Sequence, residues 1–213
     1  MSDHHNETLT AVLCEDHWQI DSERRSYITF KADGSGQVSH THAVFVTRGQ
    51  LTGAKIVLRR DMPIAICAEI EWRPVNPESF DDVNLDVGNG ADGGSSSVAA
   101  EFEIEITLTK RRPASWGPKV ERLRINEHQL TEDAFAPKTY RVTLERGEFR
   151  SREDLSRFPA SEMPAWAERF ALRLLFDKSP YPPRQEWKQP EGMPDANKVW
   201  EWKEFCGRRF PRS

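Results

Sequence analysis

The chain has 213 residues, of which 37% are hydrophobic, and its formal net charge is -4. This length fits one large domain, and the mixed, slightly acidic charge excludes the basic field of a duplex nucleic-acid binder. No apolar run approaches the ~18 residues of a membrane span, and three widely spaced cysteines exclude a disulfide framework. We therefore expect a cytoplasmic protein with neither a nucleic-acid nor a membrane partner.

The chain divides into three parts by composition. Residues 1–11 are polar and are expected to be a disordered N-terminus, and residues 12–178 are expected to form a β-rich domain. Within that domain, residues 77–98 are rich in Asp, Asn, Gly and Ser, which predicts a flexible loop. Residues 179–213 are rich in proline and aromatic residues and are expected to be an extended tail packed on the domain.

Strands are predicted from an alternation of apolar and polar residues. In Glu101–Thr109 the even positions are apolar and the odd positions polar, which places the carboxylates on one face of a strand. The same alternation recurs along the chain. It predicts strands at about 26–31, 37–47, 54–60, 64–73, 100–110, 119–126, 139–146 and 169–177.

Helical signals are few. Ser151–Arg157 is one short polar candidate, and Pro164 favours a helix start within Ser161–Glu168. A third candidate is Asp195–Cys206, where Asp195 is a possible cap and apolar residues recur on one stripe.

Strands that each have one apolar face can bury those faces together by closing into a barrel, which also removes exposed edges. A two-sheet sandwich is the alternative, because alternation looks the same in both. We expect a mainly β fold: an antiparallel barrel of about eight strands, with one or two short helices and an extended C-terminal tail.

The first predicted strand has a characteristic setting. Trp18-Gln19-Ile20 precedes Tyr27–Lys31, and the turn Ala32–Gly36 follows at once. This opening resembles that of lipocalin-like (calycin) proteins, in which an N-terminal Trp closes one end of the barrel. The resemblance implies that Arg173, on a late strand, lies near Trp18, and that the barrel carries a small ligand.

Candidate ligand-binding residues lie on the predicted inner faces. His40 and His42 are two residues apart on a strand, so they point to the same side as Val38. Trp72 and Phe102 end or line the apolar faces of their strands and could border a hydrophobic pocket. The alternative for both aromatic residues is a simple place in the core.

Two histidines at this spacing can bind a metal or relay protons, but a metal site needs at least a third ligand. No third ligand is placed by spacing, and hydrogen-bonded or hydrated histidines are the simpler interpretation, so we expect no metal and no cofactor. The third-ligand candidates by elimination are His17, Glu121 and His128.

Three functions stay open. The first is a non-enzymatic protein that binds a small hydrophobic molecule inside the barrel. The second is a barrel enzyme of the cyclase or isomerase type that uses His40 or His42 as general acid or base. The third is a protein-interaction module that offers the acidic 77–105 region and the aromatic tail. The apolar inner face shared by the strands and the lipocalin-like opening favour the first. The chain lacks nucleophile, phosphate-loop and dinucleotide motifs, so the sequence gives no support for a covalent nucleophile or a cofactor.

Overall fold

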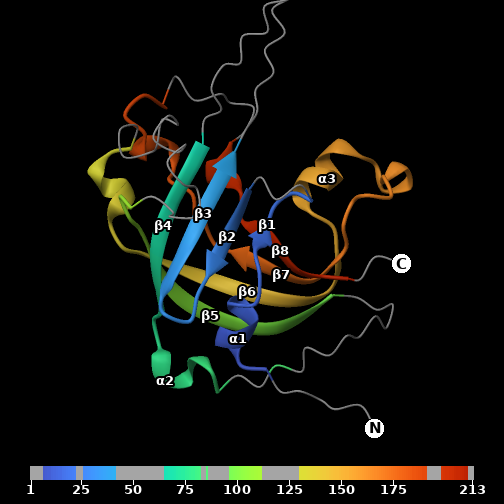
Figure 1. Cartoon of the computed structure of the whole chain (residues 1–213), viewed down its shortest axis with the longest axis horizontal. Helices are drawn as coiled ribbons and strands as arrows, with labels where there is room; N and C mark the ends of the chain where they lie inside the picture. The colour runs from blue at the N-terminus through green and yellow to red at the C-terminus, as the bar shows by residue number, and fades with distance from the viewer. Residues whose placement is uncertain are drawn as a thin grey trace, which may run out of the picture.

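The computed structural model describes residues 7–22, 26–41, 65–82, 85, 96–111, 130–190 and 198–210. Over these residues, each strand pairs antiparallel with the next and the last pairs with the first, so the sheet closes into a barrel (Figure 1). The predicted mainly β, eight-stranded antiparallel fold is confirmed. The strands are β1 (Trp18–Gln19), β2 (Ser26–Phe30), β3 (Ser35–Thr41), β4 (Ala65–Pro74), β5 (Ser97–Leu108), β6 (Lys138–Phe149), β7 (Phe170–Phe176) and β8 (Glu204–Arg209).

The alternation along each strand decides which side chains enter the barrel. On β5, Ile104 and Ile106 are buried while Glu101 is exposed, as the sequence predicts. Aliphatic side chains from neighbouring strands meet them in the centre and form one continuous core. Burial of these side chains contributes roughly 1.5–3 kcal/mol each relative to exposure, and this is what holds the ring closed.

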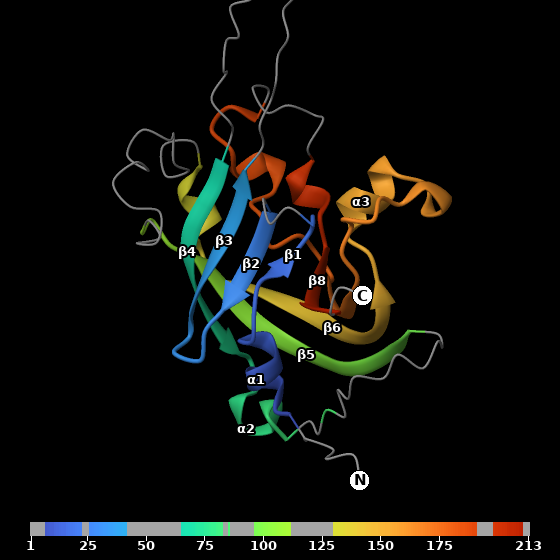
Figure 2. The same ribbon diagram turned by 45° about the vertical axis from the view of Figure 1, so that its right-hand side comes forward.

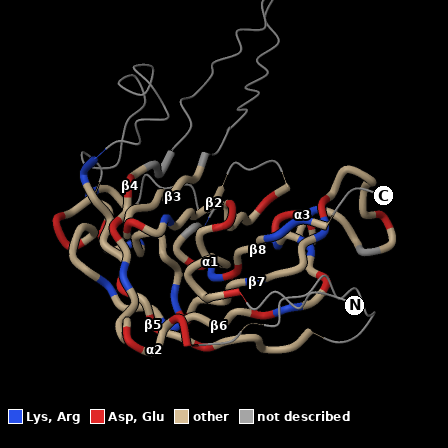
Figure 3. The backbone as a smooth tube through the Cα atoms, turned by 60° about the horizontal axis from the view of Figure 1, so that its bottom comes forward, with Lys and Arg blue, Asp and Glu red and all other residues tan. Residues whose placement is uncertain are grey.

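Lys and Arg residues alternate with Asp and Glu residues along the strands, so charges of both signs are mixed over the barrel (Figure 3). Glu105 on β5 pairs with Arg73 on β4 at 2.9 Å, and Glu103 pairs with Arg141 on β6 at 3.7 Å. Exposed pairs of this kind contribute at most about 1 kcal/mol each. We therefore interpret these ion pairs as part of the solvent-exposed surface of the sheet.

Two short helices, α1 (Leu9–Leu13) and α2 (Pro77–Phe80), lie at one end of the barrel (Figure 2). The expected disorder up to residue 11 is wrong for α1, because Leu9 is fully buried and the Thr8 hydroxyl caps the helix at Ala11 N. The expected loop over residues 77–98 likewise contains ordered parts. Phe80 and Leu85 are buried, and Leu85 forms a bridge with Glu7.

The opposite end is crossed by the chain that follows β7 (Figure 2). We call residues 179–187 the strap. Tyr181 of the strap is 1% exposed, and its hydroxyl donates to the Ser39 carbonyl oxygen at 2.9 Å. Trp187 is also buried, so these aromatic rings of the predicted tail are not available as a contact surface for a partner.

The range expected as a packed tail also supplies the last strand. A helix at Asp195–Cys206 is wrong: Val199–Glu201 is one 3-10 turn (η9), and β8 begins at Glu204. A strand forms here because Phe205 packs in the main core while Cys206 is buried in a separate cluster with Phe149 and Phe170. β8 also pairs with β7 on one side and with β1 on the other.

The segment between β6 and β7 forms an excursion on the side of the barrel. The predicted helix at Ser151–Arg157 is confirmed as α3 (Arg152–Arg157), where the Ser151 hydroxyl accepts from Asp154 N. A helix through Ser161–Glu168 is wrong, because η5 (Ala160–Glu162) ends before Pro164 and a turn follows. The strands predicted at 54–60 and 119–126, and the end of the one at 37–47, lie outside the described residues.

Candidate functional site

The predicted ligand-binding residues do not gather in one place. Trp72 donates from Nε1 to the Lys31 carbonyl oxygen at 3.0 Å, and its ring lies 6.2 Å from that of Phe80. Phe102 is half-buried and its ring lies 5.4 Å from the same Phe80. Both residues therefore belong to the barrel end that α1 and α2 cover.

His40 lies toward the other end. It stands opposite Ile66 on β4, six residues before Trp72 along that strand, and six residues of strand span roughly 20 Å. A single site built from His40, Trp72 and Phe102 is therefore not formed. His42, the other member of the predicted pair, lies outside the described residues.

His40 is a core histidine with a polar partner. Its Nδ1 lies 2.8 Å from the hydroxyl oxygen of Ser26, and both residues are buried. The rings of Trp202 and Tyr181 cover it edge-on, at centroid distances of 4.9 Å and 6.3 Å. The acid–base role of His40 stays a prediction, since this geometry explains a buried imidazole without one.

No metal site is formed by the residues that the structure describes. In those ranges no group of three or more His, Cys, Asp or Glu side chains is placed to hold an ion. His17 lies at the surface, where its Nδ1 is 2.9 Å from Asp16, and Glu121 and His128 lie outside the described residues.

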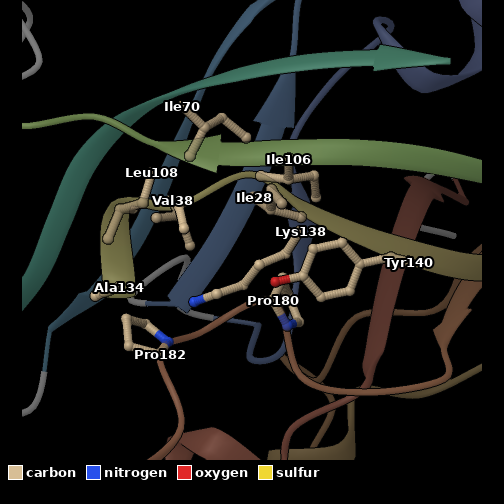
Figure 4. Close-up of a pocket in the computed structure, with 11 residues that line it drawn as sticks. Ile28, Val38, Ile70, Ile106, Leu108, Ala134, Lys138, Tyr140, Pro180 and Pro182 are labelled. Atoms are coloured by element: carbon tan, nitrogen blue, oxygen red, sulfur yellow. The ribbon is translucent and has the colours of Figure 1, made fainter. Parts of the chain in front are cut away.

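A small cavity lies inside the barrel at the strap end (Figure 4). Pro180 and Pro182 of the strap form part of its wall, and most of the remaining wall is made of aliphatic side chains from the strands together with Ala134 and Ala136, which precede β6. Its volume is about 10 Å³, which is close to the space that one water molecule needs. The strand residues that line it with apolar groups are Ile28, Val38, Ile70, Ile106 and Leu108.

Two polar side chains reach into this apolar cavity. Lys138 begins β6 and Tyr140 follows two residues later, so both point to the inside of the barrel (Figure 4). The ammonium of Lys138 lies 2.5 Å from a carboxylate oxygen of Glu186 in the strap, and the two side chains are 22% and 12% exposed. The cavity is therefore apolar, and the ion pair between Lys138 and Glu186 lies at its border.

The phenol of Tyr140 is neutral in this site. Burial raises the pKa of Tyr140 well above its ordinary value, and the carboxylates of Glu186 and Asp177 raise it further. Each effect disfavours the phenolate. Tyr140 therefore keeps its proton throughout the physiological pH range and can only donate to, or accept from, a ligand as a hydroxyl.

The sequence held a signal for this site that the search for histidines and aromatic residues missed. Tyr140, Val142 and Leu144 mark the inner face of the predicted strand at 139–146, and Lys138 continues that face by one more step of two. A lysine on an apolar strand face is unusual, because a buried ammonium group needs an acidic side chain to pair with. That partner, Glu186, lies in the tail, whose path over the barrel no local pattern predicts.

Arg173, which the lipocalin resemblance placed near Trp18, lies elsewhere. Its guanidinium is on the outer face of β7, 2.6 Å from Glu145 and over the ring of Phe149. Trp18 instead packs on Gly207 of β8, and the next residue, Arg208, pairs with Glu15 at 2.5 Å beside α1.

Comparison with known proteins identifies no relative. Family models, curated proteins and solved structures each give no match to this chain. None of the helices within the described ranges is long and apolar enough to cross a bilayer.

Proposed function

We propose that the barrel binds a small apolar molecule at the strap end, in the manner of lipocalin-like proteins. The observation that carries this proposal is the cavity between the aliphatic strand faces and the strap. Small-molecule sites are mostly apolar with a few placed polar groups, and Lys138 and Tyr140 are such groups here. Trp18 and α1 close the other end, as an N-terminal Trp does in the lipocalin-like architecture.

The size of the cavity sets a condition on binding. A site for a drug-sized ligand occupies roughly 300–1,000 Å³, whereas this cavity measures about 10 Å³. An eight-stranded barrel is just wide enough for its own side chains or for one small ligand. A ligand larger than water must therefore displace Pro180, Tyr181 and Pro182, whose place inside the barrel it then takes.

The test uses N-phenyl-1-naphthylamine, a neutral apolar dye that fluoresces when it leaves water. We expect saturable binding to the native chain, and at least tenfold weaker binding to Leu108→Lys, because this change puts a long cationic chain at the cavity wall. Val98→Lys is the matched control on the same strand, since Val98 is 58% exposed and should bind the dye normally.

The absence of saturable binding to the native chain would contradict the proposal. So would equal dye affinities of Leu108→Lys and Val98→Lys. Native mass spectrometry of the purified protein adds an independent readout, in which a bound small molecule is retained by the native chain and lost from Leu108→Lys.

We also propose a cytoplasmic location. Its support is that Cys14 and Cys206 are both free thiols, as is usual in a reducing compartment. A native protein isolated with either cysteine in a disulfide would contradict this location.

A further inference from the structure

We infer that the strap is an internal competitor for the binding site, and that the ligand carries one anionic group which replaces Glu186 on Lys138. This inference rests on the proposed function and goes further by naming the charge of the ligand and the element that controls access. Two properties of the strap support it: what it puts into the barrel, and where it puts its carboxylate.

The strap resembles an apolar acid in its contacts. Pro180, Tyr181 and Pro182 fill the apolar end of the barrel, and a few residues later Glu186 brings a carboxylate to the ammonium of Lys138. The same short segment thus packs against the apolar wall and pairs with the ammonium of Lys138. A ligand that replaces the strap must make the same two interactions, with an apolar part and an anionic group.

The positive charge of Lys138 favours the binding of an anionic ligand over a neutral one. Its side chain is 22% exposed, so removal of Glu186 would leave a largely buried cation without its partner. An unpaired buried charge is strongly destabilising, whereas a carboxylate or sulfonate on the ligand restores the pair. The hydroxyl of Tyr140 lines the same cavity and offers a second donor to that group.

The strap is attached to the rest of the barrel at both of its ends. Its Glu186 end is held by Thr131 N, which donates to the Glu186 carbonyl oxygen at 2.8 Å, and by a bridge between Leu130 and Trp187. At its other end Tyr181 packs against Phe205, and its hydroxyl donates a hydrogen bond to the Ser39 carbonyl oxygen. The strap is not one of the paired strands of the barrel, so a ligand that replaces it does not have to break the ladder that joins them.

The experiment compares two dyes with the same aromatic skeleton. 1-Anilinonaphthalene-8-sulfonate carries an anionic group that N-phenyl-1-naphthylamine lacks, so the ratio of their affinities reports the preference for an anion. Glu186→Gln removes the internal carboxylate, and we expect it to raise this ratio about tenfold. Lys138→Met is expected to lower the ratio below that of the native chain, because no cation is left for the sulfonate.

The double variant Glu186→Gln/Lys138→Met tests whether the two effects are linked. If the gain needs Lys138, Glu186→Gln raises the ratio much less in the Lys138→Met background than in the native chain. The double variant also leaves no unpaired buried charge, so its folding is secured even where Glu186→Gln is unstable. Glu132→Gln is the matched control, because its pair with Lys110 is 2.7 Å long but exposed, and we expect no change in the ratio.

The inference is overturned if Glu186→Gln leaves the ratio of the two affinities unchanged, or if Glu132→Gln changes it equally. Because the readout is a ratio, a general loosening of the strap that admits both dyes does not imitate the expected result. Failure of the neutral dye to bind any of the variants would instead contradict the proposed function, so the two failures are distinguishable.

Discussion

Tyr181→Ala is expected to lower the free energy of unfolding by about 3–5 kcal/mol, the range for removal of a large buried aromatic side chain. Tyr181 is 1% exposed and its ring stacks on Phe205 at 6.2 Å. Edge contacts to His40 and Trp202 complete its surroundings. Denaturant unfolding, followed by far-UV circular dichroism, measures the change.

The same variant is expected to bind N-phenyl-1-naphthylamine more tightly than the native chain, because the side chain that a ligand must displace is gone. Tyr181→Phe is the control: it keeps the ring and loses only the hydrogen bond to Ser39, so it should cost about 1 kcal/mol. A stability loss in Tyr181→Ala no greater than that in Tyr181→Phe would show that the ring does not fill the barrel end.

Trp18→Ala is expected to cost a similar 3–5 kcal/mol or so, at the opposite end of the barrel. Trp18 is 2% exposed, and its Nε1 donates to the Leu13 carbonyl oxygen at 3.0 Å, which fixes the end of α1. The ring lies on Gly207, where an added Cβ would be 2.7 Å from Trp18 Cε3. Loss of the indole therefore removes a contact between the first and last strands as well as a core side chain.

A pair of substitutions separates the packing of this ring from its hydrogen bond. Gly207→Ala overpacks the contact and should cost about 1–3 kcal/mol in the native background. In Trp18→Ala the three ring atoms nearest to the added methyl group are gone, so Gly207→Ala should cost much less there than in the native background. Equal costs of Gly207→Ala in both backgrounds would contradict the contact. Urea unfolding of the four chains gives the required differences.

The long strands are the part of the fold that the sequence predicts well. On β7, and on β5 from Ala100 to Leu108, the inner and outer faces alternate regularly, and burial of one face forces a single register. The prediction of a closed barrel follows from those strands, because their apolar faces need a common interior. Period-two alternation predicts a strand reliably when one face of that strand is buried and the other is exposed to solvent.

The elements that close the barrel were harder to predict. β1 has two residues, which is too short for any period, and β8 has Gly207 at an inward position, where the apolar side chain of a regular pattern would stand. Both positions are explained by one contact, in which the Trp18 ring takes the space above Gly207. A contact between two segments so far apart in the chain cannot be predicted from the local sequence of either segment.

The candidate site was missed for a related reason. Its cation, Lys138, could be found from the strand pattern, but its carboxylate and its proline wall come from the strap. The path of the strap depends on where Tyr181 fits, and that depends on the complete barrel. Nor does the sequence report free volume, since an interior of aliphatic side chains can be filled or open with the same alternation.

The pairing of Gln19 with Cys206 joins segments from the two extremes of the described chain. All other neighbours in the ring are consecutive strands, which can associate as local hairpins. Contacts between distant segments slow folding, since the chain must first lose the entropy of a very long loop. The ring is thus expected to close last, leaving β1 and β8 as open edges meanwhile. Pulsed hydrogen exchange during refolding would contradict this order if the amides of β8 became protected before those of β5 and β6.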